Sequence, residues 1–544
     1  MTRQRFVGDN RVFVLPLVLF LALAGGMVVG RAKAPVQSPA AARPAVAPRT
    51  ASDCSALIQL SPPDTLITSA TLVPARGTLP EYCKVLGGIE KVILFQVDLP
   101  TAAWNGKFYF AGGGGWNGSI PDLSQALTLG YAAAGTDTGH QGAALDASWA
   151  YKNEEAQINY AHRADHLVTV VAKQIVKSFY GEPERHAYFV GCSNGGKMGL
   201  MEVQRYPEDY EGVIIGNFVI DRTKLLTSFL WVAQALEAAP IPQYKIPAIE
   251  RATLAACDAR DGLTDGLVDR PDRCTFDPGT LLCSGADKPD CLTAGQVNAL
   301  QKIYSGPTTS SGQPWYPGYA PGHEDDYANY ITGFGTMNSY PSSTYKFQDG
   351  FMRYLVFQPD FDPIKDFSFD RDLPTVARLA ALHDADTADL TPFKSRGGKL
   401  IMYHGWADHS IPPLRTVQYY EDIRKAHGAG ADDFTRLFMV PGLHHCTSGP
   451  GPIDFGGRGQ RWLRDDPDHN LVRALERWVE QGVAPNRIVG AKFVNDDPEQ
   501  GIARTRPLCP WPQMARYTGS GSIDDAANFV CAVPDAGASG QAGR

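Results

Sequence analysis

Residues 186–196 read HAYFVGCSNGG. The first five residues form a short, largely apolar run that predicts a strand, and a helix-like stretch follows the two glycines. A strand, a sharp Gly-x-Ser-x-Gly turn and a helix are the setting of a serine nucleophile elbow, which exposes the serine at the end of its strand. Ser193 is therefore the candidate nucleophile, and the segment favours an α/β fold.

Two later strands carry the acid and the base that such a serine needs. A serine hydroxyl becomes a good nucleophile when a histidine takes its proton and a carboxylate orients the histidine. The strand expected at 400–403 leads into Asp408, and the strand at 436–440 leads into His444 and His445. The order Ser193, Asp408, His445 is the nucleophile, acid, base order of α/β-hydrolases.

Other interpretations of these residues exist. Asp408 alone is also compatible with a helix cap, and the paired histidines with zinc ligation. A zinc site needs further ligands at suitable spacing, and the sequence offers none that stand out. Cys192 is a second candidate nucleophile, but a disulfide to Cys446 would leave it no free thiol.

The pattern around the elbow predicts an α/β-hydrolase core, a mostly parallel sheet flanked by helices, with a large inserted lid domain. Short apolar strands alternate with amphipathic helices up to about residue 219 and again after residue 386, whereas 220–386 lacks regular alternation and is rich in Gly, Pro, Ser and Tyr. The expected strands are 107–110, 131–135, 400–403 and 436–440, and the expected helices are 166–180 and 470–482. Residues 54–219 and 387–535 are thus the expected catalytic domain, 220–386 the lid, and 536–544 a disordered tail.

A glycine run is the candidate oxyanion loop. Residues 112–115 are four consecutive glycines directly after the strand at 107–110. The backbone N–H groups of Gly113 and Gly114, together with that of Asn194 after the nucleophile, are the expected oxyanion donors. A phosphate-binding loop is the alternative, but such loops precede a helix and usually carry a lysine.

The N-terminus has the layout of a secretory signal. Three arginines (Arg3, Arg5 and Arg11) precede an apolar stretch at 12–29, and a small-x-small site follows at 32–34. We expect cleavage of residues 1–34 and a secreted or periplasmic protein without stable membrane association; an uncleaved anchor is the alternative. The Ala- and Pro-rich residues 35–53 are expected to be a disordered linker.

Ten cysteines, an even number with no CxxC spacing, favour disulfides. Spacing does not fix connectivity, but local proximity favours four pairs and leaves Cys192 and Cys446 for each other. A bond between these two would force Ser193 and His445 close together. The four local pairs are Cys54 with Cys83, Cys257 with Cys274, Cys283 with Cys291, and Cys509 with Cys531.

The charge pattern excludes one class of partner and suggests one ligand. The formal net charge is -8 and no basic block occurs, so nucleic acid is not an expected partner.

Residues 257–269 read CDARDGLTDGLVD, in which carboxylates recur every three or four residues. Such spacing can surround a hard cation with oxygens, and crowded acids are costly without one. A solvated acidic loop is the alternative.

Together these features resemble the tannase and feruloyl esterase family of secreted α/β-hydrolases, which includes mono(2-hydroxyethyl) terephthalate hydrolase-like members. The resemblance rests on the glycine run with Trp116-Asn117-Gly118, the elbow, Asp408, His445-Cys446 and the acidic loop. It implies a Ser193, Asp408, His445 triad above a Cys192–Cys446 disulfide. It also implies structural Ca²⁺ in the lid, with no organic cofactor. The implied ligands are the carboxylates of Asp258, Asp261 and Asp265 and the carbonyls of Leu263 and Leu267.

The sequence thus predicts an exported carboxylic ester hydrolase acting on small aromatic esters, such as feruloyl or galloyl esters. Terephthalate-type or other aromatic esters are an alternative within the same chemistry. A non-catalytic, calcium-dependent binding protein on the same fold is an alternative of another class.

Overall fold

The computed structural model describes residues 49–334 and 341–534. The predicted signal, most of the linker and the predicted tail lie outside the described residues. Helix α1 (Ala51–Ala56) starts before the expected boundary at residue 54, because Thr50 and Asp53 form a capping box at its N-terminus. Within the two described ranges, no helix is both long and apolar enough to cross a membrane.

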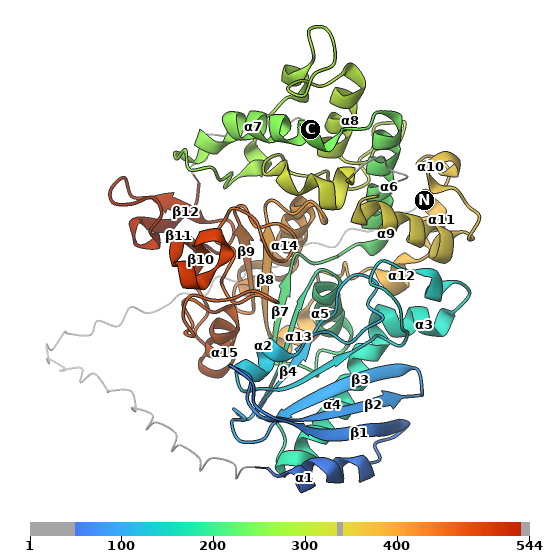
Figure 1. Cartoon of the computed structure of the whole chain (residues 1–544), viewed down its shortest axis with the longest axis vertical. Coiled ribbons are helices and arrows are strands. Elements are labelled where there is room, and N and C mark those ends of the chain that lie inside the picture. The colour runs from blue at the N-terminus through green and yellow to red at the C-terminus, as the bar shows by residue number, and fades with distance from the viewer. Residues whose placement is uncertain (1–48, 335–340, 535–544) are drawn as a thin grey trace, which may run out of the picture. The chain divides into compact units, whose positions relative to one another are not determined.

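One nine-stranded sheet organises the fold, in the order β1-β2-β3-β5-β4-β6-β7-β8-β9 (Figure 1). The strands from β5 to β9 run parallel to one another, whereas β1, β2, β3 and β5 are joined by antiparallel pairing. The strands are β1 (Thr65–Val73), β2 (Tyr82–Ile89), β3 (Ile93–Pro100), β4 (Lys107–Ala111), β5 (Ala132–Thr136), β6 (His186–Cys192), β7 (Gly212–Gly216), β8 (Lys399–Gly405) and β9 (Thr435–Val440).

Helices cover both faces of the parallel strands, as predicted. In β4, Phe108 and Phe110 pack into one hydrophobic cluster, whereas Tyr109 packs into the other. The first cluster includes residues of α4 (Ala164–Tyr180), α5 (Asn194–Arg205) and α14 (Pro413–His427), and the second includes α2 (Ser124–Thr128) and α15 (Leu471–Gln481). Burial on both faces explains why these strands read as continuous apolar runs.

The first three strands differ from the expected strand and helix alternation. The connections from β1 to β2 and from β2 to β3 span residues 74–81 and 90–92. A parallel crossover needs a dozen or more residues, so connections this short require antiparallel pairing. The sheet therefore begins with an antiparallel meander.

The chain between β7 and β8 contributes only helices among its described residues. They build a hydrophobic cluster of their own around Leu236 and Leu300, and most of a second one around Phe229 and Phe351, which also includes Trp116 and Tyr160. By their contacts, the described residues nevertheless form one compact unit. The helices are α6 (Arg222–Ala238), α7 (Ile246–Cys257), α8 (Ala294–Ser305), α9 (Ser343–Phe351), α10 (Pro363–Asp366), α11 (Leu373–Ala377), α12 (Ala380–His383) and α13 (Thr391–Ser395).

Two small antiparallel pairs, which the sequence reading did not anticipate, follow the sheet. Strand β10 (Ile488–Phe493) pairs with β11 (Ile502–Leu508), and β12 (Met514–Tyr517) pairs with β13 (Phe529–Ala532). A short helix, α3 (Glu154–Ile158), precedes α4.

Candidate active site

The nucleophile elbow is a sharp turn between β6 and α5. Strand β6 ends at Cys192 and α5 begins at Asn194, so Ser193 alone makes the turn, with φ 62° and ψ −126°. A non-glycine residue at positive φ is strained, and such strain is typical of functional turns. The turn also packs tightly, since a Cβ on Gly195 would lie 2.8 Å from the carbonyl carbon of Gly112.

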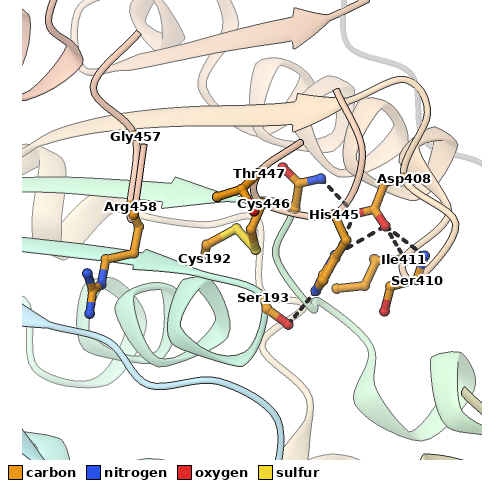
Figure 2. Close-up of a disulfide and its surroundings, with 12 residues drawn as sticks. Cys192, Ser193, Asp408, Ser410, Ile411, His445, Cys446, Thr447, Gly457 and Arg458 are labelled. Atoms are coloured by element: carbon orange, nitrogen blue, oxygen red, sulfur yellow. Dashed lines mark hydrogen bonds and ion pairs between the residues drawn. A yellow bond between two sulfur atoms is a disulfide. The ribbon is translucent and has the colours of Figure 1, made fainter. Parts of the chain in front are cut away.

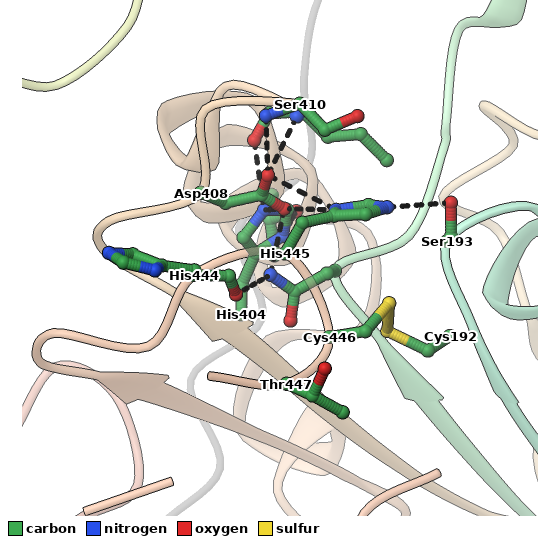
Figure 3. Close-up of polar contacts among 12 residues, drawn as sticks. Cys192, Ser193, His404, Asp408, Ser410, His444, His445, Cys446 and Thr447 are labelled. Atoms are coloured by element: carbon green, nitrogen blue, oxygen red, sulfur yellow. Dashed lines mark hydrogen bonds and ion pairs between the residues drawn. A yellow bond between two sulfur atoms is a disulfide. The ribbon is translucent and has the colours of Figure 1, made fainter. Parts of the chain in front are cut away.

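Asp408 and His445 lie beside Ser193 because all three follow parallel strands that end at one edge of the sheet. His445 Nε2 lies 2.9 Å from Ser193 Oγ, and His445 Nδ1 lies 2.9 Å from Asp408 Oδ2 (Figure 3). This continuous path can carry the serine proton to the imidazole while the carboxylate stabilises the resulting cation. The structure therefore brings together the three residues that the sequence order selected.

Asp408 is buried and held by several donors. The backbone N–H groups of Ser410 and Ile411 donate to its Oδ1 at 2.7 and 2.9 Å, and Asn217 Nδ2 donates to Oδ2 at 2.7 Å. Burial alone would raise the pKa of Asp408, but His445 and His404 outweigh it and lower that pKa. The carboxylate is thus ionised throughout the physiological range.

Sequence reasoning missed Asn217 and His404. Asn217 follows β7, the strand between the elbow strand and the Asp408 strand, and also donates to the carbonyl of His444 at 3.2 Å. His404 lies within β8, with its Nε2 3.2 Å from Asp408 Oδ2. The signal for Asn217 was its position directly after a buried strand, but its contact with Asp408 depends on the strand order.

A disulfide joins the serine and histidine loops. Cys192 and Cys446 are bonded with their Cα atoms 5.9 Å apart, next in sequence to Ser193 and His445 (Figure 2). The other four pairs are those expected from local proximity. Cys192 is therefore not a free thiol. Among the described residues, neither His444 nor His445 belongs to a group of three potential metal ligands.

The glycine loop after β4 lies against the start of α5. Within the described residues, the backbone N–H groups of Gly113 and Asn194 have no hydrogen-bond acceptor. Free N–H groups at a helix start and on an adjacent loop can bind a developing oxyanion. Gly114 faces open space, because a Cβ there would meet no atom within 4 Å.

A buried guanidinium supports Asn194 from the helical segment. Arg222, at the start of α6, donates to Asn194 Oδ1, and Tyr160 donates to the same oxygen at 3.0 Å. Asn194 Nδ2 in turn donates to Asn117 Oδ1 at 3.3 Å. Arg222 is 3% exposed and lies over the ring of Trp116. These contacts fix the first residue of α5, whose N–H is one of the candidate oxyanion donors.

Aromatic side chains border the candidate site. Tyr330 presents its ring edge to His445 with the ring centroids 5.5 Å apart. Trp116, directly after the glycine run, contacts the rings of Tyr160, Trp149 and Phe347. Trp149 and Phe347 are half-buried. Trp116 and Tyr160 are fully buried, so the partly exposed rings of this group are those of Tyr330, Trp149 and Phe347.

In the predicted calcium loop, aspartate carboxylates accept hydrogen bonds from backbone N–H groups of the same loop. Asp258 accepts the N–H groups of Asp265 and Gly266 at 3.2 and 3.0 Å, and Asp261 accepts that of Leu263 at 2.9 Å. Burial, followed by the charges of Asp265 and Asp258, raises the pKa of Asp261 to about 6. The oxygen-only donor set and this mutual repulsion suit a hard cation. Among the described residues, however, no three of these carboxylates have ligand atoms within 4.8 Å of one another, so the structure does not bring the three expected carboxylate ligands together.

Asp269 joins this cluster, although the expected ligand set did not include it. It is 4% exposed, and its Oδ1 has no hydrogen-bond partner in the part of the chain that the structure describes. Burial and the charge of Asp261 raise the pKa of Asp269 to about 7. Arg506 pairs with Asp265 and offsets part of the negative charge.

The sheet order, the elbow after β6 and the positions of Asp408 and His445 define an α/β-hydrolase. The sequence matches the family described as tannase and feruloyl esterase over residues 78–532, so the chain belongs to that family and is a carboxylic ester hydrolase.

Relatives with curated sequences or solved structures support this assignment. The chain is 38% identical to an uncharacterized esterase of Xanthomonas campestris, with 89% of this chain and 92% of that protein covered. It is 32% identical to the mono(2-hydroxyethyl) terephthalate hydrolase of Piscinibacter sakaiensis, with 86% and 87% covered. The crystal structure of feruloyl esterase B from Aspergillus oryzae is similar at a TM-score of 0.80 and 27% identity, covering 89% of this chain and all of that one.

Proposed function

We propose that this protein is an exported esterase that cleaves esters of aromatic acids, such as feruloyl or galloyl esters, through a Ser193, His445, Asp408 triad. The observation that carries the chemistry is the path from Ser193 Oγ through His445 to Asp408, at 2.9 Å in each step. Export is supported by the predicted signal at 1–34 and by the five disulfides.

The proposed mechanism follows from these contacts. His445 Nε2 accepts the proton of Ser193 as its Oγ attacks the ester carbonyl carbon. The carbonyl oxygen becomes an oxyanion that accepts the N–H groups of Asn194 and of Gly113 or Gly114. His445 then gives the proton to the leaving alcohol, and an acyl-enzyme remains on Ser193. Water, deprotonated by His445, hydrolyses this ester and restores the serine.

The preference for aromatic acids is supported by the residues around the serine. The ring of Tyr330 meets His445, and the half-buried Trp149 and Phe347 pack around Trp116 beside the glycine loop. Planar rings bind favourably to such edges and faces. Terephthalate esters carry the same planar ring, and the similarity to a mono(2-hydroxyethyl) terephthalate hydrolase makes them the second candidate substrates.

A substrate panel tests the proposal. The purified chain should hydrolyse methyl ferulate, methyl p-coumarate, methyl gallate or mono(2-hydroxyethyl) terephthalate with a kcat/KM at least ~10-fold above that for an aliphatic ester of similar size. A tenfold difference corresponds to about 1.4 kcal/mol, within the range of one good aromatic contact. Equal rates on the aliphatic ester would contradict aromatic specificity. No hydrolysis of any ester would leave a calcium-dependent binding protein as the better account.

We also propose that the loop at 258–269 binds one calcium ion with a structural role. Asp258, Asp261 and Asp265 would hold it with the carbonyls of Leu263 and Leu267. The raised pKa values in this loop support a cation that relieves carboxylate repulsion. Elemental analysis of protein purified without chelator is the direct test.

A further inference from the structure

A second group of potential metal ligands lies outside the candidate active site. His166 comes from α4, Glu202 from α5, and Asp209 from the loop before β7. The ligand atoms of these three residues all lie within 4.8 Å of one another, and His166 Nδ1 is 2.7 Å from Asp209 Oδ2. The ring of His166 is stacked on Tyr206 with centroids 4.0 Å apart, which fixes its orientation.

Glu202 is the unusual member of this group. It is 1% exposed, and no donor among the described residues reaches its carboxylate oxygens; the carboxyl group of Asp209 is the polar group within hydrogen-bonding reach. Burying an ionised carboxylate without a partner is strongly unfavourable, so a native fold normally supplies a donor or a cation. Lys173 lies nearby, but its ammonium donates to the backbone carbonyl of Asp209 and pairs with Glu184. Asp165 is also 1% exposed, and neither of its oxygens has a hydrogen-bond partner among the described residues, but the buried ammonium of Lys197 partly offsets its charge.

We propose that His166, Glu202 and Asp209 bind a divalent transition-metal ion, for which Zn²⁺ is the best match. Tetrahedral zinc with ligands at about 2.0–2.1 Å separates those ligands by roughly 3.3 Å. This value lies between the 2.7 Å of the His166–Asp209 pair and the 4.8 Å limit of the group. One imidazole with two carboxylates suits zinc, whereas calcium and magnesium prefer oxygen alone.

Access and position define the role of this site. The His166 side chain is 26% exposed, which gives an ion a route to the buried carboxylates. Glu202 lies eight residues beyond Asn194 along α5, or about 12 Å from the oxyanion end of the helix at 1.5 Å per residue. The ion would therefore join α4, α5 and the loop before β7 without touching the ester. Its effect is on stability, and the ester chemistry does not depend on it.

The alternative to a bound metal ion is a proton shared between the carboxyl groups of Glu202 and Asp209. Burial and the charge of Asp209 raise the pKa of Glu202, which favours a protonated carboxyl at this position when no ion is bound. A metal ion binds the deprotonated carboxylate and therefore displaces any such proton. Glu202→Gln keeps the shape of the protonated acid but lacks an anionic oxygen. The variant therefore distinguishes a site that binds a metal ion from a carboxyl pair that only shares a proton.

The experiment uses the full chain, treated with chelator and then kept in excess Ca²⁺ throughout, so that the acidic loop at 258–269 does not compete. Zn²⁺ is titrated by calorimetry, and Co²⁺ by its visible absorption as a geometric probe. The wild type should bind one Zn²⁺ and show a higher Tm when it is bound. Glu202→Gln and His166→Asn should each weaken binding by at least ~100-fold, since even outer-shell changes cost 10–100-fold.

His162→Asn is the matched control. His162 lies on the same helical segment, but its Nδ1 contacts the hydroxyl of Tyr206 instead of the acids. This variant should keep the wild-type affinity, and every variant should keep its rate of ester hydrolysis. The proposal is overturned if the wild type binds no stoichiometric Zn²⁺, or if Glu202→Gln, shown to be folded by its own Tm, binds Zn²⁺ as tightly as the wild type. Either result would assign the buried pair to a shared proton.

Discussion

Removing the disulfide between the serine and histidine loops should impair both stability and catalysis. The bond closes a loop of 254 residues. In the chain-entropy model a loop of this length contributes roughly 5 kcal/mol to the free energy of unfolding, although measured values are often lower. Replacing Cys192 and Cys446 by alanine also frees two loops whose catalytic atoms must stay 2.9 Å apart. Misplacement by about 1 Å can cost 10²-fold, so kcat/KM should fall about 10–100-fold.

A control disulfide separates the two effects. Cys509 and Cys531 close a loop of 22 residues joined to the C-terminal hairpins, for which the same model gives roughly 3 kcal/mol. The variant without this bond should lose stability in urea but keep kcat/KM when assayed in native buffer. The reasoning is refuted if both double variants lose activity to the same extent, or if the variant lacking Cys192 and Cys446 keeps the full kcat/KM while folded.

Three further predictions follow from named contacts. Arg222→Met removes the buried donor to Asn194 and should lower kcat about 10-fold with KM nearly unchanged, because a hydrogen bond from a charged group is worth ~1.5–3 kcal/mol. An unchanged kcat in a folded variant would show that Arg222 does not support the oxyanion donor Asn194. Asp408→Asn should lower kcat by roughly 10³–10⁴-fold at every pH, because the pKa of Asp408 lies below its ordinary value and its charge is present across the assay range. A loss of kcat confined to acidic pH would contradict this prediction. Without calcium, the stability of the fold should fall as the pH rises from about 4 to 7, because the pKa values of Asp261 and Asp269 are raised to about 6 and about 7 from an unfolded value of about 3.9. Excess Ca²⁺ should abolish this pH dependence. Identical pH profiles of Tm in EDTA and in calcium would argue against the site.

The sequence predicted the parts of the fold that are periodic and fully buried. Strands β4, β6, β8 and β9 are apolar runs because both of their faces are covered, and α4 ends at Tyr180, the last residue of the helix expected at 166–180. Ser193, Asp408 and His445 follow such strands, so their order along the chain was enough to place them at one edge. The antiparallel meander of β1, β2 and β3 was missed, because pairing direction depends on connection length more than on residue pattern.

Contacts between distant segments that no motif or cysteine pairing connects could not be predicted from the sequence. Asn217 supports Asp408 only because β7 lies between β6 and β8 in the sheet. Arg222 looked like any charged residue of an irregular segment, yet it is buried against Asn194. Such contacts bring together residues that no local period or motif connects, and only the folded chain reveals them.

The central claim is that Ser193 is the nucleophile of an ester hydrolase. A serine-directed phosphonate tests it most directly, with intact-mass and peptide mass spectrometry of the labelled wild type and of Ser193→Ala. The wild type should take up one phosphonate on Ser193 and lose activity in proportion. Ser193→Ala should stay unlabelled and retain less than about one thousandth of the wild-type kcat, in line with loss of a triad member. Labelling at another residue, together with an active Ser193→Ala, would contradict the account.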